Sequence, residues 1–452
     1  MTRPNVLLIY TDQQRADALG AAGNDQIHTP HLDDLTARGT RFANHFVQNP
    51  LCMPSRISML TGRYPSSLGI THMGVPVPED TATLATHLGR VGYHCANIGK
   101  LHFLPHANRE HRDLHPAYDF DHLQISEEPG VYEDAYWSWL RERAPTPASR
   151  PSAPLPPARA IWHELMGATT TDIEPRDDYA EIIPFALDEE LTHSAFVADE
   201  TIEYLSTRRG GAPFFCIAGF FSPHAPYIVP PSFIDLYDDR LEPPEADTCG
   251  DQAEDLARCR TATHGYYAAV SEVDHHVGRI LSALDANGQR DDTIVIFTSD
   301  HGDWLGNQGR YAKGYPGDDP VTHVPFVMTG PQIATGRTVD DISEAVDLVP
   351  TILEACAVPV PPAVQGRSLL DSLRATASTR STRSALTEGA GWKSLRTASH
   401  RLLVHDDGTI QVTEAATGND ASGDESLVAD LTEALLVRLL ENERPLPRTY
   451  PY

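Results

Sequence analysis

The sequence predicts an α/β fold: a large mixed, mostly parallel sheet sandwiched by helices, with a smaller C-terminal antiparallel sheet plus helix. Three observations support it. Apolar runs of strand length alternate with amphipathic helical patterns over most of the chain. Polar and charged residues follow these runs directly, as at the carboxyl ends of buried parallel strands. Two short apolar runs joined by a turn, and a last helical pattern, lie near the C-terminus.

Four apolar runs are predicted to be strands of the large sheet, because each is continuous and is followed at once by polar groups. They span 5–10, 94–98, 213–221 and 293–297. The side chains that follow them include aspartates, histidines and a lysine, namely Asp12, Lys100, His102, His224, Asp300 and His301. Since ligands of open α/β sheets bind outside the carboxyl ends of the strands, we expect these side chains to share one site.

Helical patterns separate the predicted strands. Apolar residues recur at helical spacing over 81–91, 194–205 and 266–284, so helices are expected on both faces of the sheet. Residues 103–190 break this alternation, because they are Pro-rich, acidic and poorly periodic. A stretch of that length in a compact domain is usually functional or disordered, and we expect a lid-like excursion over the site.

The chain is predicted to form a catalytic domain over 1–375 and a small C-terminal α+β domain over 376–452. A chain of 452 residues exceeds one minimal domain, and a Ser/Thr/Arg-rich stretch marks the boundary. The expected C-terminal elements are two strands and a helix, over 401–404, 409–413 and 425–440. The extended tail beyond them carries prolines and tyrosines. It is expected to dock on this chain or on a second subunit of a homo-oligomer.

The charge balance limits the possible partners. The chain has 35 basic and 63 acidic residues, so its net charge is −28. Such a surface repels nucleic acid and anionic membranes, and neither is expected as a partner. No secretory signal or membrane-length apolar run is evident, so a cytoplasmic location is expected. The six cysteines form no C-x-x-C pair, and reduced thiols are expected rather than disulfides or a zinc site.

Cys52 stands at a predicted helix start. Pro54 suits a first helical turn, and Gly62 supplies a stop. Backbone N–H groups and the helix dipole favour an anion at such a position. These features alone leave two readings open, a buried structural thiol or a reactive group in an electropositive setting.

Asp12, Asp300 and His301 form a candidate metal site. Hard oxygen donors with one imidazole suit Ca²⁺, Mg²⁺ or Mn²⁺ better than zinc, which takes more Cys or His. Each aspartate taken alone is more often a helix cap or a turn residue than a metal ligand. The metal interpretation therefore depends on the charged groups that follow the other strands.

Several segments resemble the sulfatase family. Cys52–Arg56 reads C-M-P-S-R and is followed by L-T-G-R, similar to the sulfatase signature C-x-P-S-R with a later T-G-R. Around it, "PNVLLIYTDQQ", "GYHCANIGKLH", "FFSPHAPY", "TSDHGDWLGNQGRYAK" and "HVPFVMTGP" keep the order seen in sulfatases. The resemblance covers about residues 3–370. It points to the alkaline phosphatase superfamily and its branch of bacterial arylsulfatases, choline-sulfatases and phosphonate monoester hydrolases.

The resemblance implies a modified Cys52. A maturation enzyme that reads Cys52, Pro54 and Arg56 would oxidise the cysteine to Cα-formylglycine. The aldehyde would hydrate to a geminal diol, one hydroxyl of which attacks sulfur while the other later expels sulfate. A plain serine could perform the first step, but it would remain a sulfate ester.

The resemblance also implies a metal site. The residues that match the family's ligands are Asp12, Gln13, Asp300, His301 and the modified Cys52. Gln13 stands where many sulfatases have a second aspartate, so it would bind through a neutral carbonyl oxygen. One divalent cation is expected, Ca²⁺ first, with Mn²⁺ or Mg²⁺ as alternatives.

Five residues match the family's catalytic positions. Arg56 matches the arginine that steadies the formylglycine. Lys100 and His102 match the pair that orients the diol and helps eliminate sulfate. His224 and Lys313 match the pair that reaches the transferring group and the leaving oxygen, as general acid and charge neutraliser. Lys100, His224 and Lys313 would thereby also bind substrate.

The substrate implied is a small sulfate ester or sulfamate. A phosphonate monoester or phosphodiester hydrolase using the same site is the alternative, and a non-catalytic binding protein of the same fold is a third reading. The acidic surface disfavours long polysulfated glycans. His72 is a candidate pocket residue. After Lys313 the family often has Tyr-Glu, whereas this chain has "GYPGDD", which bears on substrate identity.

Overall fold

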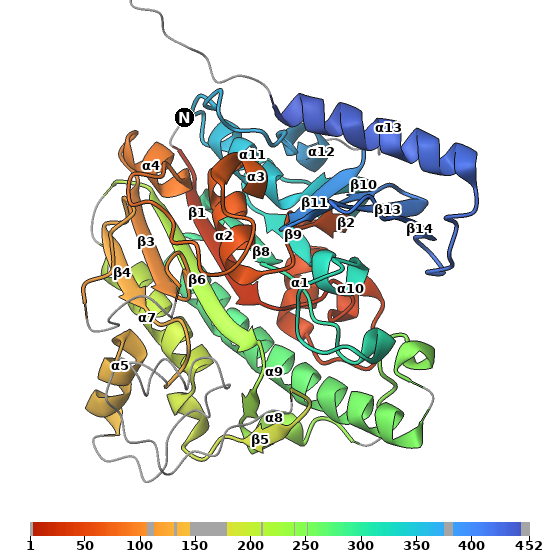
Figure 1. Cartoon of the computed structure of the whole chain (residues 1–452). Coiled ribbons are helices and arrows are strands. Elements are labelled where there is room, and N and C mark those ends of the chain that lie inside the picture. Colours follow the sequence, from red (N-terminus) through yellow and green to blue (C-terminus); the bar gives the residue numbers. More distant parts are fainter. Residues whose placement is uncertain are drawn as a thin grey trace, which may run out of the picture.

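The computed structural model describes residues 3–105, 113–130, 133–144, 179–208, 211–238, 240–250, 252–374 and 383–443. An eight-stranded sheet lies at its centre, and a four-stranded sheet with a long helix lies beside it (Figure 1). A further pair, β5 and β7, joins Ile182–Pro184 to Tyr227–Val229. The described elements therefore match the predicted α/β class.

The large sheet is mixed and mostly parallel, as predicted. Its strand order is β10-β2-β9-β8-β1-β6-β3-β4, and β9 alone runs against its neighbours. The strands are β1 Asn5–Asp12, β2 Thr40–Phe46, β3 His94–Gly99, β4 His122–Ile125, β6 Phe214–Pro223, β8 Thr293–Ser299, β9 Phe326–Thr329 and β10 Arg337–Glu344. The four strands predicted from apolar runs are neighbours in this order, as β8-β1-β6-β3.

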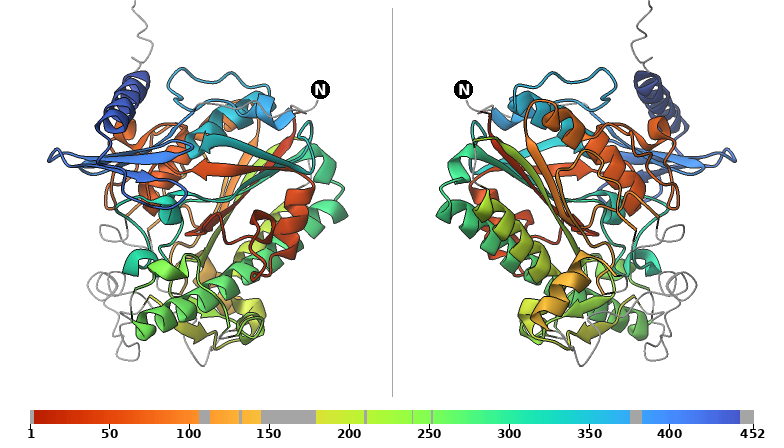
Figure 2. Two further views of the ribbon diagram at one scale, coloured as in Figure 1. Left: turned by 90° about the vertical axis from the view of Figure 1, so that its right-hand side faces the viewer. Right: turned by 90° about the vertical axis from the view of Figure 1, so that its left-hand side faces the viewer.

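Alternation along β1 shows why both faces of the sheet are covered. Val6, Leu8 and Tyr10 pack into one apolar cluster, and Leu7 and Ile9 pack into another on the opposite face. Helices lie on both sides of the sheet (Figure 2). The first cluster takes residues from α2 Cys52–Thr61, α4 Leu84–Gly89, α11 Leu348–Ala355 and α12 Leu370–Arg374. The second takes residues from α1 Pro30–Ala37, α5 Ala135–Arg143, α7 His193–Thr207 and α9 Ala253–Ala286.

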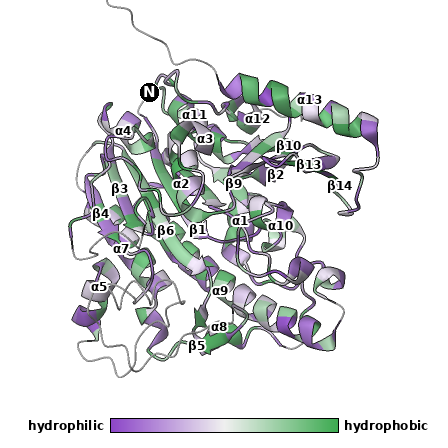
Figure 3. Cartoon of the chain, in the orientation of Figure 1, coloured by the Kyte–Doolittle hydropathy of each residue, from purple (hydrophilic) through white to green (hydrophobic). Residues whose placement is uncertain are grey.

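Hydropathy follows these layers. The central strands are coloured largely hydrophobic, whereas α9 and α13 carry both colours along their length (Figure 3). The shorter helices are α3 Pro65–Leu68, α8 Pro231–Ile234 and α10 Asp319–Thr322. None of the helices in the described ranges is both long and apolar enough to cross a bilayer. All six cysteines are buried and free.

The excursion predicted over 103–190 is described only in part. Its residues 122–125 form β4, which adds an edge strand to the main sheet beside β3. The ranges 106–112, 131–132 and 145–178 lie outside the described residues. The lid therefore stays a prediction.

The C-terminal unit has the predicted antiparallel sheet and helix. Its strands are β11 Ala385–Gly389, β12 Trp392–Arg396, β13 His400–His405 and β14 Ile410–Glu414, in that order. The helix α13, Glu425–Asn442, packs Leu431 and Leu435 against Leu386, Leu395 and Leu402 of the sheet. The tail 444–452 lies outside the described residues, so its docking stays a prediction.

A buried ionic cluster ties the C-terminal unit to the main sheet. Glu344, at the end of β10, accepts hydrogen bonds from Tyr64 Oη at 2.9 Å and from Arg383 Nη2 at 2.8 Å, and it also pairs with Arg438 of α13. Arg383 reaches Asp347 at 2.5 Å as well. Glu344 and Asp347 have no exposed surface, so the positive charges of the arginines offset the cost of burying these two carboxylates.

Candidate active site

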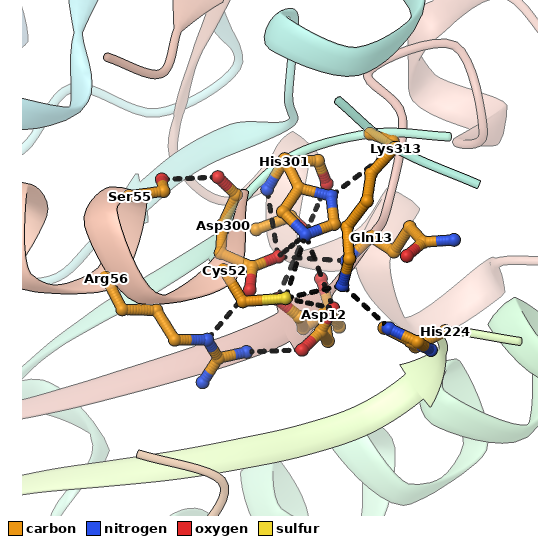
Figure 4. Close-up of polar contacts among 12 residues, drawn as sticks. Asp12, Gln13, Cys52, Ser55, Arg56, His224, Asp300, His301 and Lys313 are labelled. Atoms are coloured by element: carbon orange, nitrogen blue, oxygen red, sulfur yellow. Dashed lines mark hydrogen bonds and ion pairs between the residues drawn. The ribbon is translucent and has the colours of Figure 1, made fainter. Parts of the chain in front are cut away.

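The carboxyl ends of four strands converge on the N-terminus of α2. Asp12 ends β1, Asp300 follows β8, Lys100 follows β3 and His224 follows β6. Cys52 is the first residue of α2, where the helix dipole favours negative charge. The side chains from these separate segments point toward one another around the sulfur (Figure 4).

Four buried side chains form a set that could hold a metal ion. Asp12, Cys52, Asp300 and His301 each offer one ligand atom, and these atoms lie within 4.8 Å of one another. The Cys52 Sγ atom is 3.2 Å from His301 Nε2 and 3.7 Å from Asp12 Oδ1. His301 Nδ1 donates to the Gly302 carbonyl at 2.8 Å, so the lone pair of Nε2 faces the cluster.

Gln13 lies beside this set in a strained conformation. Its φ of 74° is in the left-handed region, and its backbone N–H donates to Asp300 Oδ1 at 3.0 Å. Its amide Nε2 donates to Asp303 Oδ2 at 2.5 Å. Among the described residues, its buried Oε1 atom has no hydrogen-bond partner. A carbonyl oxygen left over in this way fits a cation ligand.

Arg56 holds the two aspartates together. Its Nε donates to Asp300 Oδ2 at 2.7 Å and its Nη2 to Asp12 Oδ2 at 3.2 Å, while Nη1 donates to the Lys100 carbonyl at 2.9 Å. The guanidinium also lies 4.6 Å from the centre of the Tyr10 ring. Burial opposes its charge, but Asp300 and Asp12 raise the pKa of Arg56 overall. Arg56 therefore stays charged with no exposed surface.

Lys313 joins Cys52 to His224. Its Nζ donates to Cys52 Sγ at 2.6 Å and to His224 Nε2 at 2.8 Å. Burial lowers the pKa of Lys313, yet Cys52, Asp12 and Asp300 outweigh it and raise the pKa overall. For His224, burial and then Lys313 hold the pKa well below its usual value. Its Nδ1 donates to the Ala225 carbonyl at 2.5 Å, so a neutral ring accepts from the ammonium through Nε2.

The pKa of the Cys52 thiol is lowered by its surroundings. Burial and the charge of Asp12 raise it, but Lys313, His301 and Lys100 outweigh both. The pocket therefore favours a negatively charged atom at this position. In a chain of net charge −28, this cationic concentration is a local exception.

Lys100 and His102 lie at the same sheet edge. Lys100 Nζ is 2.6 Å from Asp12 Oδ2 and 4.8 Å from the centre of the Phe221 ring. His102 is buried, with a φ of 56°, and its backbone N–H donates to Glu127 Oε1 at 2.9 Å. The structure thus brings every predicted strand-end residue to one edge of the sheet.

Sequence reasoning missed three residues that hold this site. Ser55 Oγ donates to the Asp300 carbonyl at 2.5 Å, and Asp303 holds the Gln13 amide. Glu127 reaches His102 because β4 lies parallel to β3, with Gly99 paired to Ile125. Ser55 and Asp303 lie inside segments already singled out, whereas the only signal for Glu127 is its place just after a short strand.

His72 lies away from these contacts as far as its described neighbours show. It is exposed, and its ring nitrogen is 3.4 Å from the Thr71 hydroxyl. Its place in a substrate pocket stays a prediction.

Comparisons with known proteins agree with the motifs. The sulfatase family model matches residues 4–358. An arylsulfatase from Clostridium perfringens is 30% identical over 408 residues, covering 83% of this chain and 80% of the relative. A choline-sulfatase from Rhizobium meliloti is 28% identical over 386 residues, covering 79% of this chain and 68% of the relative.

Solved structures share the fold. A phosphonate monoester hydrolase of Agrobacterium radiobacter superposes with a TM-score of 0.80 at 23% identity, covering 97% of this chain and 96% of that one. Residues 4–358, which the family model matches, contain the strand ends and the Cys52 helix described above. The chain belongs to the sulfatase family, a family of sulfuric ester hydrolases in the alkaline phosphatase superfamily.

Proposed function

We propose that the protein hydrolyses a sulfate ester or sulfamate of a small organic substrate, with a nucleophile derived from Cys52. The observation that carries this proposal is the position of the Cys52 Sγ atom. It lies at the start of α2, 2.6 Å from Lys313 Nζ and 3.2 Å from His301 Nε2. The Lys313 ammonium at this distance favours both an anionic nucleophile and the charge of a bound sulfate.

The proposed nucleophile is formylglycine made from Cys52 by a maturation enzyme. The aldehyde adds water to become a geminal diol. One hydroxyl loses its proton and attacks sulfur, and the S–O bond to the alcohol breaks. The second hydroxyl then loses its proton as the C–O bond to sulfate breaks, which restores the aldehyde and releases sulfate.

The side chains at the strand ends fit a divalent cation. Asp12, Asp300, His301 and the Gln13 Oε1 atom supply hard oxygen donors and one imidazole, a set that suits Ca²⁺. When bound, the ion supplies positive charge that stabilises the attacking oxygen and the sulfate oxygens. Arg56 orients both aspartates through its contacts at 2.7 and 3.2 Å.

The remaining cations divide the work by position. His224 Nε2 and Lys313 Nζ are 2.8 Å apart, so the Lys313 ammonium is held where it can donate a proton to a leaving oxygen that lies beside this pair. Lys100 is paired to Asp12 at the end of β1 and is placed to orient the diol with His102. The ammonium of Lys313 neutralises the charge that develops on the leaving oxygen.

The same arrangement could act on phosphorus. A relative of 30% identity is a multifunctional alkaline phosphatase superfamily protein from Trinickia caryophylli, which favours testing this alternative. We expect kcat/KM for an aryl sulfate to exceed that for the matching aryl phosphonate monoester. The reverse order would replace the sulfatase proposal with the phosphonate monoester hydrolase one. Steady-state rates with both substrates at saturating Ca²⁺ decide it.

Metal removal is expected to abolish activity, and Ca²⁺ to restore it. Asp12→Asn and Asp300→Asn should weaken Ca²⁺ binding by more than about 100-fold, because each removes a charged ligand. Calorimetric titration of the metal-free protein measures the Ca²⁺ affinity. The matched control is Asp34→Asn, which changes an exposed aspartate on α1. Stoichiometric zinc in the purified enzyme, or unchanged Ca²⁺ affinity in both variants, would contradict the assignment.

A further inference from the structure

The segment 314–319 links Lys313 to α10 and departs from the family pattern. It contacts the C-terminal sheet instead of standing free. Tyr315 Oη is 2.8 Å from His405 Nε2 of β13, and the Tyr315 ring meets Trp392 of β12 edge-on, with centroids 5.9 Å apart. Two strands of the C-terminal sheet therefore contact Tyr315, which lies two residues after Lys313 in the chain.

Trp392 packs against the backbone of the same segment. Gly317 has a φ of 74°, and a Cβ atom there would lie 2.6 Å from the Trp392 ring. Any larger residue would therefore displace either the ring or the segment. The close approach indicates that the position of the segment is set by the tryptophan beside it.

Charged pairs fix the end of the segment. Arg396 of β12 binds Asp319 in two places, with Nε–Oδ1 at 3.0 Å and Nη2–Oδ2 at 2.9 Å. Arg401 of β13 pairs with Asp318. The Arg396 side chain is only 14% exposed and lies over the Phe46 ring of β2. Two hydrogen bonds from a largely buried arginine side chain fix the orientation of the Asp319 carboxylate as well as its distance from Arg396.

The residues before Lys313 are also held. The Ala312 carbonyl accepts from the Trp304 N–H at 2.8 Å, and Arg310 Nη1 donates to the Tyr315 carbonyl at 3.1 Å. The chain is thus held on both sides of Lys313, by hydrogen bonds within its own loop before it and by contacts with the C-terminal sheet after it. A lysine side chain is long and flexible, so its backbone must be fixed if its Nζ is to stay in register with Cys52.

We propose that β12 acts as a positioning element for Lys313, through Trp392 and Arg396. The two residues hold the segment 314–319 against the C-terminal sheet and so keep the Lys313 ammonium at the leaving oxygen. This inference rests on the proposed role of Lys313 in catalysis. It makes the C-terminal unit part of the catalytic apparatus, although neither residue touches substrate.

The test compares variants of the full-length, matured enzyme. Trp392→Ala and Arg396→Ala should each lower kcat at least about tenfold, while KM changes less than about twofold, because the lysine acts mainly in the transition state. Arg396→Lys, which keeps the charge but loses the two-point geometry, should fall between. The charge-reversed pair Asp319→Arg with Arg396→Asp should recover part of the loss seen in Arg396→Asp alone.

The matched control is Val412→Ala in β14. Val412 is buried in the cluster between the C-terminal sheet and α13, so its truncation loosens the same sheet from its other side. It should lower the melting temperature and leave kcat near wild type below the transition. If Val412→Ala lowers kcat as much as Arg396→Ala, or if the Trp392 and Arg396 variants keep wild-type kcat, the positioning role is rejected.

Lys313→Ala separates the two proposals. Full activity in this variant would reject the catalytic role of Lys313, and the positioning role with it. An inactive Lys313→Ala beside fully active Trp392→Ala and Arg396→Ala would reject the positioning role alone.

Discussion

Replacing Cys52 with alanine is expected to lower turnover at least about 10⁴-fold while leaving the fold in place. The variant deletes the proposed nucleophile, and the other site groups cannot replace it. The Cys52 side chain is buried and small, so the fold loses only one sulfur atom. Initial rates with an aryl sulfate, measured beside circular dichroism and the melting temperature, check the two parts of this expectation.

The control is Cys216→Ala, which removes another fully buried thiol, from strand β6 of the large sheet. It should keep activity. Cys52→Ser should instead complete one attack and accumulate a sulfated serine, because it has no second hydroxyl to expel sulfate. Peptide mass spectrometry of fully active wild-type enzyme should show formylglycine at position 52. Finding only the thiol there would contradict the proposed mechanism.

Replacing Glu344 with alanine is expected to lower the free energy of unfolding by about 3–5 kcal/mol. The carboxylate has no exposed surface and compensates Arg383 and Arg438, both of which are less than a tenth exposed. Without it, two guanidinium groups stay buried with less opposing charge, and the Tyr64 hydroxyl and the Leu386 N–H lose an acceptor. Urea unfolding followed by tryptophan fluorescence measures the loss.

The exposed pair on α1 gives the comparison. Arg38 and Asp34 are 2.8 Å apart with more than half of each side chain exposed. Asp34→Ala should therefore change the unfolding free energy by less than about 1 kcal/mol. Equal effects from the two substitutions would show that the buried cluster does not hold the C-terminal unit to the sheet.

The strands recognised from sequence are those buried on both faces. The runs in β1, β3, β6 and β8 are nearly free of polar residues, because helices cover each side of them. The strand β2 reads T-R-F-A-N-H-F and β10 reads R-T-V-D-D-I-S-E, and their mixed patterns hide the strand period. Both lie at one margin of the sheet, where part of each strand is not fully buried. The strand β9 is four residues long, too short to show any period.

The helix α9 was predicted too short for a similar reason. Its first turns, up to Thr261, are mostly exposed and charged, whereas the stretch from Tyr266 to Leu284 is largely buried and so periodic. Hydrophobic periodicity reports packing, and it fades where a helix leaves the core.

The site was predictable where the residue follows its own strand. Asp12, Lys100, His224 and Asp300 meet because parallel strands deliver their carboxyl ends to one edge. Lys313 lies in a loop without such a rule, and only the family resemblance pointed to it. Glu127 depends on the register between β3 and β4, which a single sequence does not reveal. Its contact is to a backbone N–H, so no side-chain pattern marks it.

The burial of α2 has a consequence for how active enzyme is made. All ten residues of this helix are buried, and Cys52 has no exposed surface. If Cys52 is converted to formylglycine as proposed above, the maturation enzyme would have to reach Cys52, Pro54 and Arg56 before the chain closes around this helix. The fraction of active molecules would then depend on the relative rates of modification and folding. Under this proposal, a folded and unmodified copy would keep its thiol until it unfolds again, and faster synthesis would lower the active fraction without changing the fold.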